Sequence, residues 1–138
     1  IIVINGRKNL KFERKLKSIS KDIKIFYSKY IINEIKNLKG KRVMAIAGIG
    51  NPDNFFDLLK KNNVKVEEKV AFPDHYNYSN DDLDRMIFEA KKRKLKLVTT
   101  EKDFLRMKLS YMKKIKCITI SLKIDNSIKF EKEILKFL

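Results

Sequence analysis

The sequence of 138 residues predicts an α/β fold: a doubly wound, mostly parallel Rossmann-like sheet with helices on both faces. Two observations lead to this prediction. From residue 43 onward, short apolar runs typical of buried strands alternate with amphipathic segments of helical length. Residues that commonly begin helices also stand at the start of these segments. With 43% hydrophobic residues, the composition is sufficient for a globular core.

The first 39 residues have a different pattern. Residues 1–4 form an apolar strand-like run that ends at Asn5 and Gly6, and residues 23–32 form a second extended stretch with alternating side chains. The Lys-, Arg- and Ser-rich stretch between them predicts neither helix nor strand clearly. Residues 36–42 are typical of a connector. Because the sequence opens inside a strand-like run without Met, we expect that a segment upstream is missing.

Residues 40–138 are expected to form the Rossmann-like domain. The predicted strands are residues 43–47, 64–72, 95–99 and 115–120; the predicted helices are residues 52–61, 81–92 and 127–138, with a helical turn at 101–107. Two helices carry one apolar stripe each, formed by Leu83, Met86, Ile87 and Ala90 and by Phe130, Ile134, Phe137 and Leu138. Asn51 before Pro52 predicts an N-cap, and Ser79 with Asp82 predicts a capping box.

The charge and the cysteine content limit the classes of function. Lys plus Arg number 33 against 17 Asp plus Glu, a net charge of +16. Lys is spread along the chain and Arg is scarce, a pattern that an A+T-rich genome would also produce, so we expect no nucleic-acid partner. An anionic membrane surface or a phosphorylated substrate fits the charge better. The single Cys117 and the single His75 favour a reducing cytoplasm and no bound metal, and no apolar run is long enough for a membrane span.

Three unusual segments directly follow predicted strands. They are residues 48–52 (Gly-Ile-Gly-Asn-Pro), 72–75 (Phe-Pro-Asp-His) and 99–103 (Thr-Thr-Glu-Lys-Asp). Because ligands bind at the carboxyl ends of parallel strands, we expect the three segments to line one crevice. Asp74 could orient His75, an arrangement suited to acid–base chemistry, although a lone loop histidine is often a bystander. Lys102 could meet a phosphate or be merely solvated, and Thr100 and Asp103 have capping-box spacing.

Two nucleotide-binding motifs are incomplete. Gly48 and Gly50 resemble the start of a dinucleotide fingerprint, but Asp53 stands where a third glycine is needed. Both glycines could instead permit a tight turn, or allow a ligand to approach the backbone. The sequence also contains no G-x-x-x-x-G-K-[ST] motif, so these residues cannot hold ATP phosphates in the P-loop manner.

Four motifs, in order and with matching spacing, resemble the C-terminal half of the tetraacyldisaccharide 4′-kinase family, the lipid A kinases. They are A-x-A-G-I-G-N-P-D-N-F-F at 45–56, F-P-D-H-Y-x-Y at 72–78, D-D-L at 81–83 and L-V-T-T-E-K-D at 97–103. The resemblance is specific over residues 40–107 and weak beyond them. It implies that residues 1–39 are a short remnant of a P-loop kinase domain and its connector.

The resemblance also implies an activity. Such enzymes use ATP and Mg²⁺ to phosphorylate the 4′-hydroxyl of tetraacyldisaccharide 1-phosphate, giving lipid IVA, at the cytoplasmic face of the bacterial inner membrane. His75 matches the family histidine, which is thought to pair with an aspartate of the N-terminal P-loop half. We therefore expect His75 and Asp74 to be catalytic, and Gly48, Gly50, Asn51 and Lys102 to contact substrate or phosphate.

Other hypotheses remain open from the sequence. Without a P-loop, this chain is expected to be inactive alone, as a fragment or as the second half of a split enzyme. The alternative is a non-catalytic binding module, or a decayed remnant, with the same fold. A basic nucleic-acid-binding domain is the least favoured.

Overall fold

The computed structural model describes residues 1–137 and divides the chain into two compact units. Residues 1–31 and the segment from residue 121 onward form the first unit, and residues 32–120 form the second. The chain leaves the first unit within strand β2 (Ile25–Ile32) and returns to it along β7 (Ile120–Ile124). No helix among the described residues is long and apolar enough to cross a membrane.

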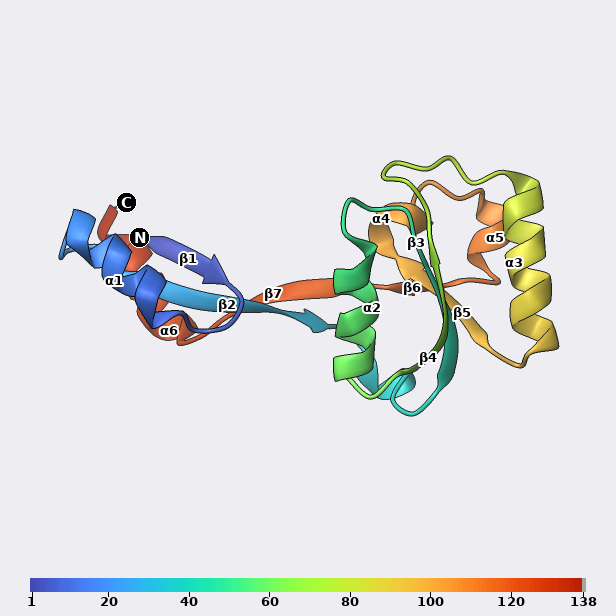
Figure 1. The fold of residues 1–138 in the computed structure, drawn as a ribbon, viewed down its shortest axis with the longest axis horizontal. Coiled ribbons are helices and arrows are strands. Elements are labelled where there is room, and N and C mark those ends of the chain that lie inside the picture. Colours follow the sequence, from blue (N-terminus) through green and yellow to red (C-terminus); the bar gives the residue numbers. More distant parts are fainter. Residues whose placement is uncertain (138) are drawn as a thin grey trace. The chain divides into compact units, whose positions relative to one another are not determined.

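The second unit is a four-stranded parallel sheet between helices (Figure 1). Its elements are η1 (Ile35–Asn37), β3 (Arg42–Ala47), α2 (Pro52–Lys61), β4 (Lys65–Ala71), α3 (Asn80–Lys92), β5 (Lys96–Thr100), α4 (Glu101–Phe104), α5 (Leu109–Met112) and β6 (Lys116–Ile118). The strand order is β4-β3-β5-β6. The connections therefore reverse direction between β3 and β5, at the switch point where sheets of this kind bind ligands.

Strand β3 forms the centre of two core layers. Val43, Ala45 and Ala47 pack in one buried cluster with Phe55, Phe56 and Leu59 of α2, whereas Met44 and Ile46 pack in another with Leu83, Met86 and Ala90 of α3. Successive residues of a strand point to opposite faces, so both faces of this sheet are covered. The fold-class prediction of a doubly wound parallel sheet is thereby confirmed.

Local sequence signals place both long helices. The Asn51 side chain accepts a hydrogen bond from the Asn54 backbone N–H and begins α2 ahead of Pro52. Ser79 and Asp82 form both halves of the predicted capping box at the start of α3. Such caps satisfy backbone N–H groups that a helix leaves unpaired. The apolar stripe predicted for α3 is confirmed, since Leu83, Met86 and Ala90 are buried.

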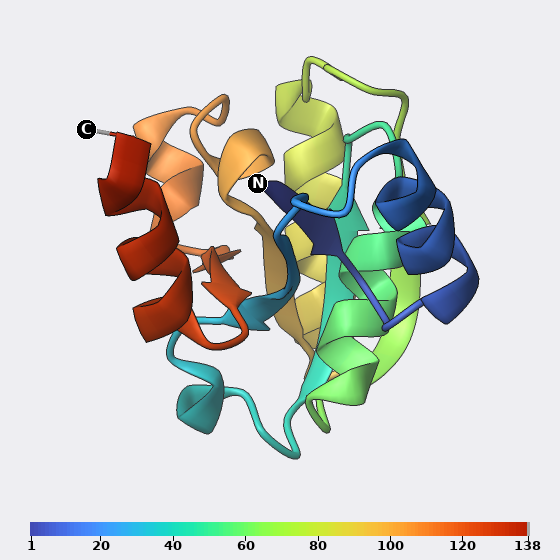
Figure 2. The ribbon, with the colours of Figure 1, turned by 90° about the vertical axis from the view of Figure 1, so that its left-hand side faces the viewer.

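The first unit contains a smaller sheet with the strand order β1-β2-β7. Its remaining elements are β1 (Ile2–Asn5), α1 (Leu10–Ile19), α6 (Ser127–Ile134) and η2 (Leu135–Phe137). Strands β1 and β2 are parallel, and Figure 2 shows α1 and α6 on either side of them. Phe26 packs edge-to-face on Phe130 of α6, with ring centroids 5.1 Å apart, and Tyr27 donates a 2.8 Å hydrogen bond to Glu13 of α1.

The elements at the ends of the chain differ from the predictions. The undecided stretch forms α1, capped by Asn9, and α5 was not predicted. The single strand predicted at 115–120 is two strands, β6 and β7, because the chain passes from one sheet to the other at Thr119. Helix α6 groups with the first unit; of its predicted stripe, Phe130 is partly buried, whereas Phe137 is 77% exposed. Leu138 lies outside the described residues.

The compact units do not coincide with the predicted boundary between residues 39 and 40. Residues 32–39 group with the parallel sheet, and the C-terminal segment groups with the first 31 residues. This grouping describes packing within the present chain. The assignment of residues 1–39 to the end of a P-loop domain and of 40–138 to the C-terminal domain stays a prediction.

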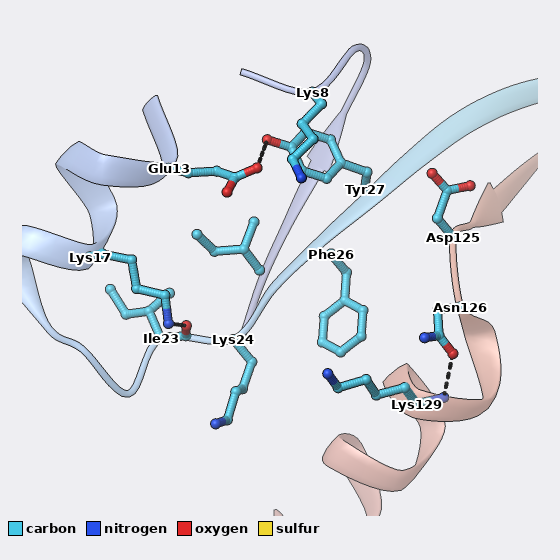
Figure 3. A pocket seen from close by; sticks show the side chains of 11 residues that line it. Lys8, Glu13, Lys17, Ile23, Lys24, Phe26, Tyr27, Asp125, Asn126 and Lys129 are labelled. Carbon is cyan, nitrogen blue, oxygen red and sulfur yellow. Dashed lines mark hydrogen bonds between the residues drawn. The ribbon is translucent and has the colours of Figure 1, made fainter. Parts of the chain in front are cut away.

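The first unit also contains a cavity of about 590 Å³ between α1, β2 and the start of α6 (Figure 3). It is lined by Lys8, Glu13, Lys17, Ile23, Lys24, Ile25, Phe26, Tyr27, Asp125, Asn126 and Lys129. Lys17 donates hydrogen bonds to the carbonyl groups of Lys21 and Ile23, and Glu13 accepts one from Tyr27. These polar groups therefore hold α1 to its neighbours, while apolar side chains from β2 form part of the wall.

Candidate functional site

Three loops meet at the carboxyl edge of the parallel sheet, where β4, β3 and β5 are neighbours. The backbone of Gly48, directly after β3, joins them. Its carbonyl oxygen accepts a hydrogen bond from the His75 N–H at 3.1 Å, and its N–H donates to Asp103 Oδ2 at 3.0 Å. The segments after all three strands are therefore adjacent, as the sheet-edge rule predicts.

Asp74, His75 and Lys102 form a contiguous polar cluster across these loops. Lys102 Nζ lies 3.4 Å from Asp74 Oδ1 and 3.3 Å from His75 Nε2, and His75 Nε2 lies 3.7 Å from Asp74 Oδ2. The cluster is open to solvent, since the His75 side chain is 69% exposed. The structure thus brings together three of the side chains that the sequence proposed, on a surface that a ligand can reach.

The other proposed residues occupy different positions relative to this cluster. A Cβ added at Gly50 would lie 3.6 Å from Asp74 Oδ2, so the Gly50 backbone borders the cluster at an ordinary contact distance. Gly48 lies beneath it, bonded to both neighbouring loops. The Asn51 side chain is engaged as the N-cap of α2. Asn51 therefore has a demonstrated structural role, and its contact with a ligand stays a prediction.

His75 adopts a left-handed backbone conformation, with φ of 61°. Four other described non-glycine residues have positive φ, but each flanks a helix: Glu34, Asn63, Lys94 and Asn126. His75 lies in a turn away from any helix end, and its N–H is held by Gly48 O and by Asp74 Oδ1 at 3.0 Å. Conformations of this kind often mark functional sites, because surrounding contacts must impose them.

The electrostatic environment keeps Asp74 ionised. Partial burial raises the pKa of its carboxyl group, but the hydrogen bond from Lys102 and the adjacent His75 outweigh that effect, so its pKa lies below the ordinary value. Asp74 therefore carries a negative charge at neutral pH. It balances the Lys102 ammonium and offers an acceptor to the His75 ring.

Two residues of the site were not identified from the sequence, Asp103 and Arg106. Asp103 is fully buried and accepts hydrogen bonds from the Gly48 N–H and from the Thr100 hydroxyl at 2.7 Å. Arg106 Nη1 lies 3.7 Å from Asp103 Oδ1, and Arg106 Nη2 lies 3.2 Å from His75 Nδ1. Thr100 caps α4 as predicted, but the Asp103 carboxylate crosses to the β3 loop instead of completing the capping box. In the sequence, the spacing from Thr100 had explained Asp103 as part of a helix cap, so its contact with the β3 loop was not predicted.

Tyr78 closes the buried side of the same cluster. A Cβ added at Gly48 would approach Tyr78 Oη at 3.0 Å and Asp103 Oδ1 at 3.2 Å, so close approach favours glycine here. Burial, reinforced by the Asp103 carboxylate, raises the pKa of the Tyr78 hydroxyl well above its ordinary value. Within the described residues, Tyr78 Oη, Asp103 Oδ1 and Arg106 Nη1 are buried without a regular hydrogen bond. Leaving such atoms unpaired costs ~1–3 kcal/mol each.

An aromatic cluster supports the loop that carries His75. The rings of Phe72, Tyr76 and Tyr78 pack against one another with centroids 4.6 to 5.3 Å apart. Tyr76 donates a 3.0 Å hydrogen bond to Asp82, which raises the pKa of the Tyr76 hydroxyl. The loop between β4 and α3 is thus fixed to the capping box of α3. The F-P-D-H-Y-x-Y motif therefore contains both the polar cluster and its packing support.

The described residues do not fit a metal ion. Among residues 1–137, no group of three or more His, Cys, Asp or Glu side chains is gathered closely enough to hold one. Asp103 lies near Gly48 and Arg106, and Asp74 lies near Lys102, so both carboxylates of the site face cationic or N–H donors. This arrangement suits an anionic group better than Mg²⁺.

Fold and site together define an α/β protein with an Asp-His-Lys cluster at the switch point of a parallel sheet. The model of the family described as tetraacyldisaccharide-1-P 4′-kinase matches residues 1–138. The chain belongs to this family, which confirms the resemblance found in its motifs.

Individual relatives agree with the family match. The tetraacyldisaccharide 4′-kinase of Pelagibacter ubique is 32% identical over 98% of this chain and 44% of its own length. The enzyme of the same name from a Chelativorans species is 43% identical over 69% of this chain and 28% of its own length. The chain thus spans less than half the length of these curated relatives.

A solved structure shares the fold. The crystal structure of the "apo" form of LpxK from Aquifex aeolicus in complex with ATP aligns with a TM-score of 0.56 and 19% identity. The alignment covers 97% of this chain and 50% of that chain. At this level of identity the similarity supports the α/β fold and leaves residue roles to other evidence.

Proposed function

We propose that this chain is part of an ATP-dependent kinase that phosphorylates the 4′-hydroxyl of tetraacyldisaccharide 1-phosphate in lipid A biosynthesis, giving lipid IVA. The observation that carries the proposal is the family match along the whole chain. The names of the relatives support the same transferase activity. Because the chain spans only part of their length, the remaining portion of such a kinase is required for turnover.

His75 is the proposed acid–base residue of this chain. Its ring is exposed at the sheet edge, its backbone is fixed by two hydrogen bonds, and Asp74 lies within 3.7 Å of Nε2. An imidazole in this position can assist the removal of a proton from a sugar hydroxyl, either directly or through a carboxylate of another domain. Asp74 orients the ring and balances its charge in this proposal.

Lys102 is proposed to attract a phosphate of the substrate, with the Gly48–Gly50 backbone and Asn51 bordering the same surface. The Lys102 side chain is 48% exposed, and Asp74 is the acidic side chain within ion-pair distance of it among the described residues. Since phosphoryl transfer depends chiefly on positioning and charge, a lysine beside the acid–base group can align an anionic substrate.

ATP and Mg²⁺ are proposed to bind mainly to the N-terminal P-loop half of the kinase. The sequence of 138 residues contains no P-loop motif, and the described residues form no metal site. Mg²⁺ would supply charge neutralisation at the phosphates when bound. This chain would contribute the opposite wall of the cleft, through His75 and Lys102.

The proposed location is the cytoplasmic face of the inner membrane, where the acylated substrate resides. The net charge of +16 favours adsorption to anionic lipid headgroups, each nearby Lys or Arg contributing ~1 kcal/mol. Apolar side chains of α6 and η2, such as Ile128, Leu135 and Phe137, are largely exposed. They supply a surface that a lipid layer or the N-terminal half can cover.

Reconstitution tests the proposal. The present chain and a P-loop half from a close relative are assayed separately and mixed, by ATP-dependent conversion of tetraacyldisaccharide 1-phosphate. We expect no turnover from either half and measurable product from the mixture. Turnover by this chain alone would contradict the proposed division of labour, and a silent mixture of folded, associating halves would favour a non-catalytic remnant.

The role of His75 is tested in the same mixture. His75→Ala should lower kcat by ~100-fold or more without loss of fold, since acid–base groups contribute factors of this size. Asn77→Ala serves as the matched control because Asn77 lies in the same loop and is exposed. Equal turnover of the two variants would remove His75 from the proposed mechanism.

A further inference from the structure

The contacts of the His75 ring raise a problem of proton placement. Both ring nitrogens face a cation: Arg106 Nη2 lies 3.2 Å from Nδ1, and Lys102 Nζ lies 3.3 Å from Nε2. A neutral imidazole has one donor nitrogen and one acceptor nitrogen, and neither cation can accept a hydrogen bond. Only one of the two contacts can therefore be a hydrogen bond to the neutral ring.

The surroundings of the two cations differ in a way that resolves this problem. Lys102 Nζ has a second acceptor within reach, Asp74 Oδ1 at 3.4 Å, and the flexible Lys102 side chain is 48% exposed. Arg106 Nη2 has the His75 ring as its only acceptor among the described contacts, and the Arg106 side chain is 22% exposed. Lys102 can donate its hydrogen bond to Asp74, whereas Arg106 Nη2 can donate only to His75 Nδ1.

Asp103 gives Arg106 its fixed direction. The Asp103 side chain is fully buried and is itself held by the Gly48 N–H and the Thr100 hydroxyl. Its Oδ1 lies 3.7 Å from Arg106 Nη1, an atom that is buried and has no other partner among the described residues. Because guanidinium is planar and rigid, holding one nitrogen also fixes where the other points.

We propose that Asp103 and Arg106 are positioning residues that set the orientation and the tautomer of His75. Asp103 anchors Arg106, Arg106 donates to Nδ1, and the proton of the neutral ring is therefore on Nε2. The Nε2–H then points toward Asp74, whose other oxygen accepts from Lys102. The series runs from the buried Asp103 to the exposed Asp74–Lys102 pair, and its Asp103–Arg106 and His75–Asp74 contacts are ion-pair contacts of 3.7 Å each. The charged groups that face the ring are Asp74, Lys102 and Arg106.

This inference deepens the proposed function, since a general acid–base group must present a defined nitrogen to its partner. Its significance for catalysis rests on the proposed role of His75, but the geometry does not. The ring state of His75 can be measured in this chain without any kinase activity. His75 is the only histidine in the sequence, so its imidazole signals are unambiguous.

The test is a two-bond ¹H–¹⁵N correlation spectrum of the ¹⁵N-labelled chain, recorded near pH 9, above the ordinary imidazole pKa of about 6.5. In the unmodified protein we expect the pattern of a pure Nε2–H tautomer. Arg106→Met should shift both nitrogen signals toward the tautomer mixture of an unrestrained imidazole. Lys102→Met should leave the pattern unchanged, because Lys102 is assigned no hydrogen bond to the ring.

Two further variants separate positioning from general damage. Arg85→Met removes a second arginine that pairs with an aspartate three residues away, Asp82, but does not approach His75. It should leave the His75 signals unchanged. Asp103→Asn keeps the shape of the side chain and removes its charge, and should shift the His75 signals in the same direction as Arg106→Met. Backbone amide spectra establish that each variant is folded, and an unfolded Asp103→Asn leaves Arg106→Met as the decisive variant.

The outcomes are distinct. Two results would overturn the proposal: a dominant Nδ1–H tautomer in the unmodified protein, or a shift caused by Lys102→Met and not by Arg106→Met. Either would mean that Lys102, and not Arg106, donates the hydrogen bond to the ring. In the reconstituted kinase, Arg106→Met should reduce kcat while KM changes little. If the spectra behave as expected but His75→Ala leaves turnover intact, the positioning stands and the proposed catalytic role of His75 fails.

Discussion

The two compact units of this chain differ in how well they bury their own apolar residues. In the second unit, residues 32–120, both faces of the sheet are covered, and residues such as Phe56 and Leu59 are almost fully buried. In the first unit, Phe26, at 6% exposure, is the one buried apolar side chain among the described residues. Ile19, Ile128 and Phe137 of that unit are each more than 65% exposed.

From this difference we expect the second unit to be stable by itself. Burial of apolar surface is the dominant favourable contribution to folding, and conformational entropy opposes folding in both units alike. The second unit meets this requirement with two core layers. The first unit has a three-stranded sheet and two short helices, and its stability depends on whatever else covers its apolar side chains. The candidate site lies entirely within the self-sufficient unit.

The largest expected effect concerns hydrogen exchange in the intact chain. Backbone amides of β3 and β5 should exchange ~1,000-fold more slowly than those of β1 and α1, a difference of ~4 kcal/mol in opening free energy. Mass spectrometry or NMR measures both sets in one sample. Similar protection in the two units would show that they unfold together, and the predicted difference in their stability would be wrong.

A second prediction tests the buried polar part of the stable unit. Asp103→Ala removes the partner of a largely buried arginine and leaves the Gly48 N–H unpaired, so we expect the free energy of unfolding to fall by ~3 kcal/mol. Urea denaturation measures the change. Asp53→Ala is the control, because Asp53 pairs with Lys69 at 3.6 Å on an exposed surface. An equal effect of both substitutions would mean that burial does not strengthen the Asp103 contacts.

The same contrast explains how much could be predicted from the sequence. The elements of the second unit from β3 to β5 were predicted nearly to the residue, because helix caps at Asn51 and Ser79 and the apolar runs of β3 and β5 agree with the tertiary structure. When local and long-range preferences coincide, local patterns suffice. In the first unit, α1 has no buried residue, and its short apolar stripe of Phe12, Leu16 and Ile19 stands among lysines and was not recognised. The placement of α6 depends on β7, which the sequence had merged with β6.

The candidate site was predictable only in part, for a related reason. The sheet-edge rule brought Asp74, His75 and Lys102 together because each follows a parallel strand. Arg106 and Asp103 lie three residues apart in sequence, a spacing that many solvent-exposed helical pairs share. Their importance comes from contacts to Gly48 and His75, 55 and 31 residues away respectively. No local pattern contains such contacts.

A smaller effect is expected from the two glycines of the β3 loop. Gly48→Ala should destabilise the protein by ~1–3 kcal/mol, because the new methyl group would press on the Pro73 carbonyl oxygen at 3.2 Å and on two buried polar atoms. Gly50→Ala meets only Asp74 at an ordinary contact distance and should change stability little. Thermal unfolding of both variants tests this. If Gly50→Ala destabilised the protein more than Gly48→Ala, the steric constraint would lie at Gly50 and the prediction would be wrong.

The smallest expected effect is a pH-dependent one at the start of α3. Ser79→Ala removes one half of the capping box and should cost ~1 kcal/mol at neutral pH. Hydrogen bonds from Ser79 and then from Tyr76 lower the pKa of Asp82, so the folded state favours the ionised carboxylate. That contribution is complete above the ordinary pKa of 3.8 and is lost as the pH falls through the lower folded-state value.

The free-energy difference between wild type and Ser79→Ala should therefore narrow on acidification below about pH 4, since protonated Asp82 accepts the Ser79 hydrogen bonds poorly. Asn51→Ala is the matched control: Asn51 caps α2 through the Asn54 N–H, with no carboxylate in its hydrogen bond, so its cost should stay constant with pH. Urea denaturation at neutral pH and near pH 3 compares the two. If the cost of Ser79→Ala is the same at both pH values, the cap stabilises α3 through the Asp82 N–H to Ser79 Oγ bond alone, and the bonds that Ser79 donates to the Asp82 carboxylate add nothing to the stability of the unit that carries His75.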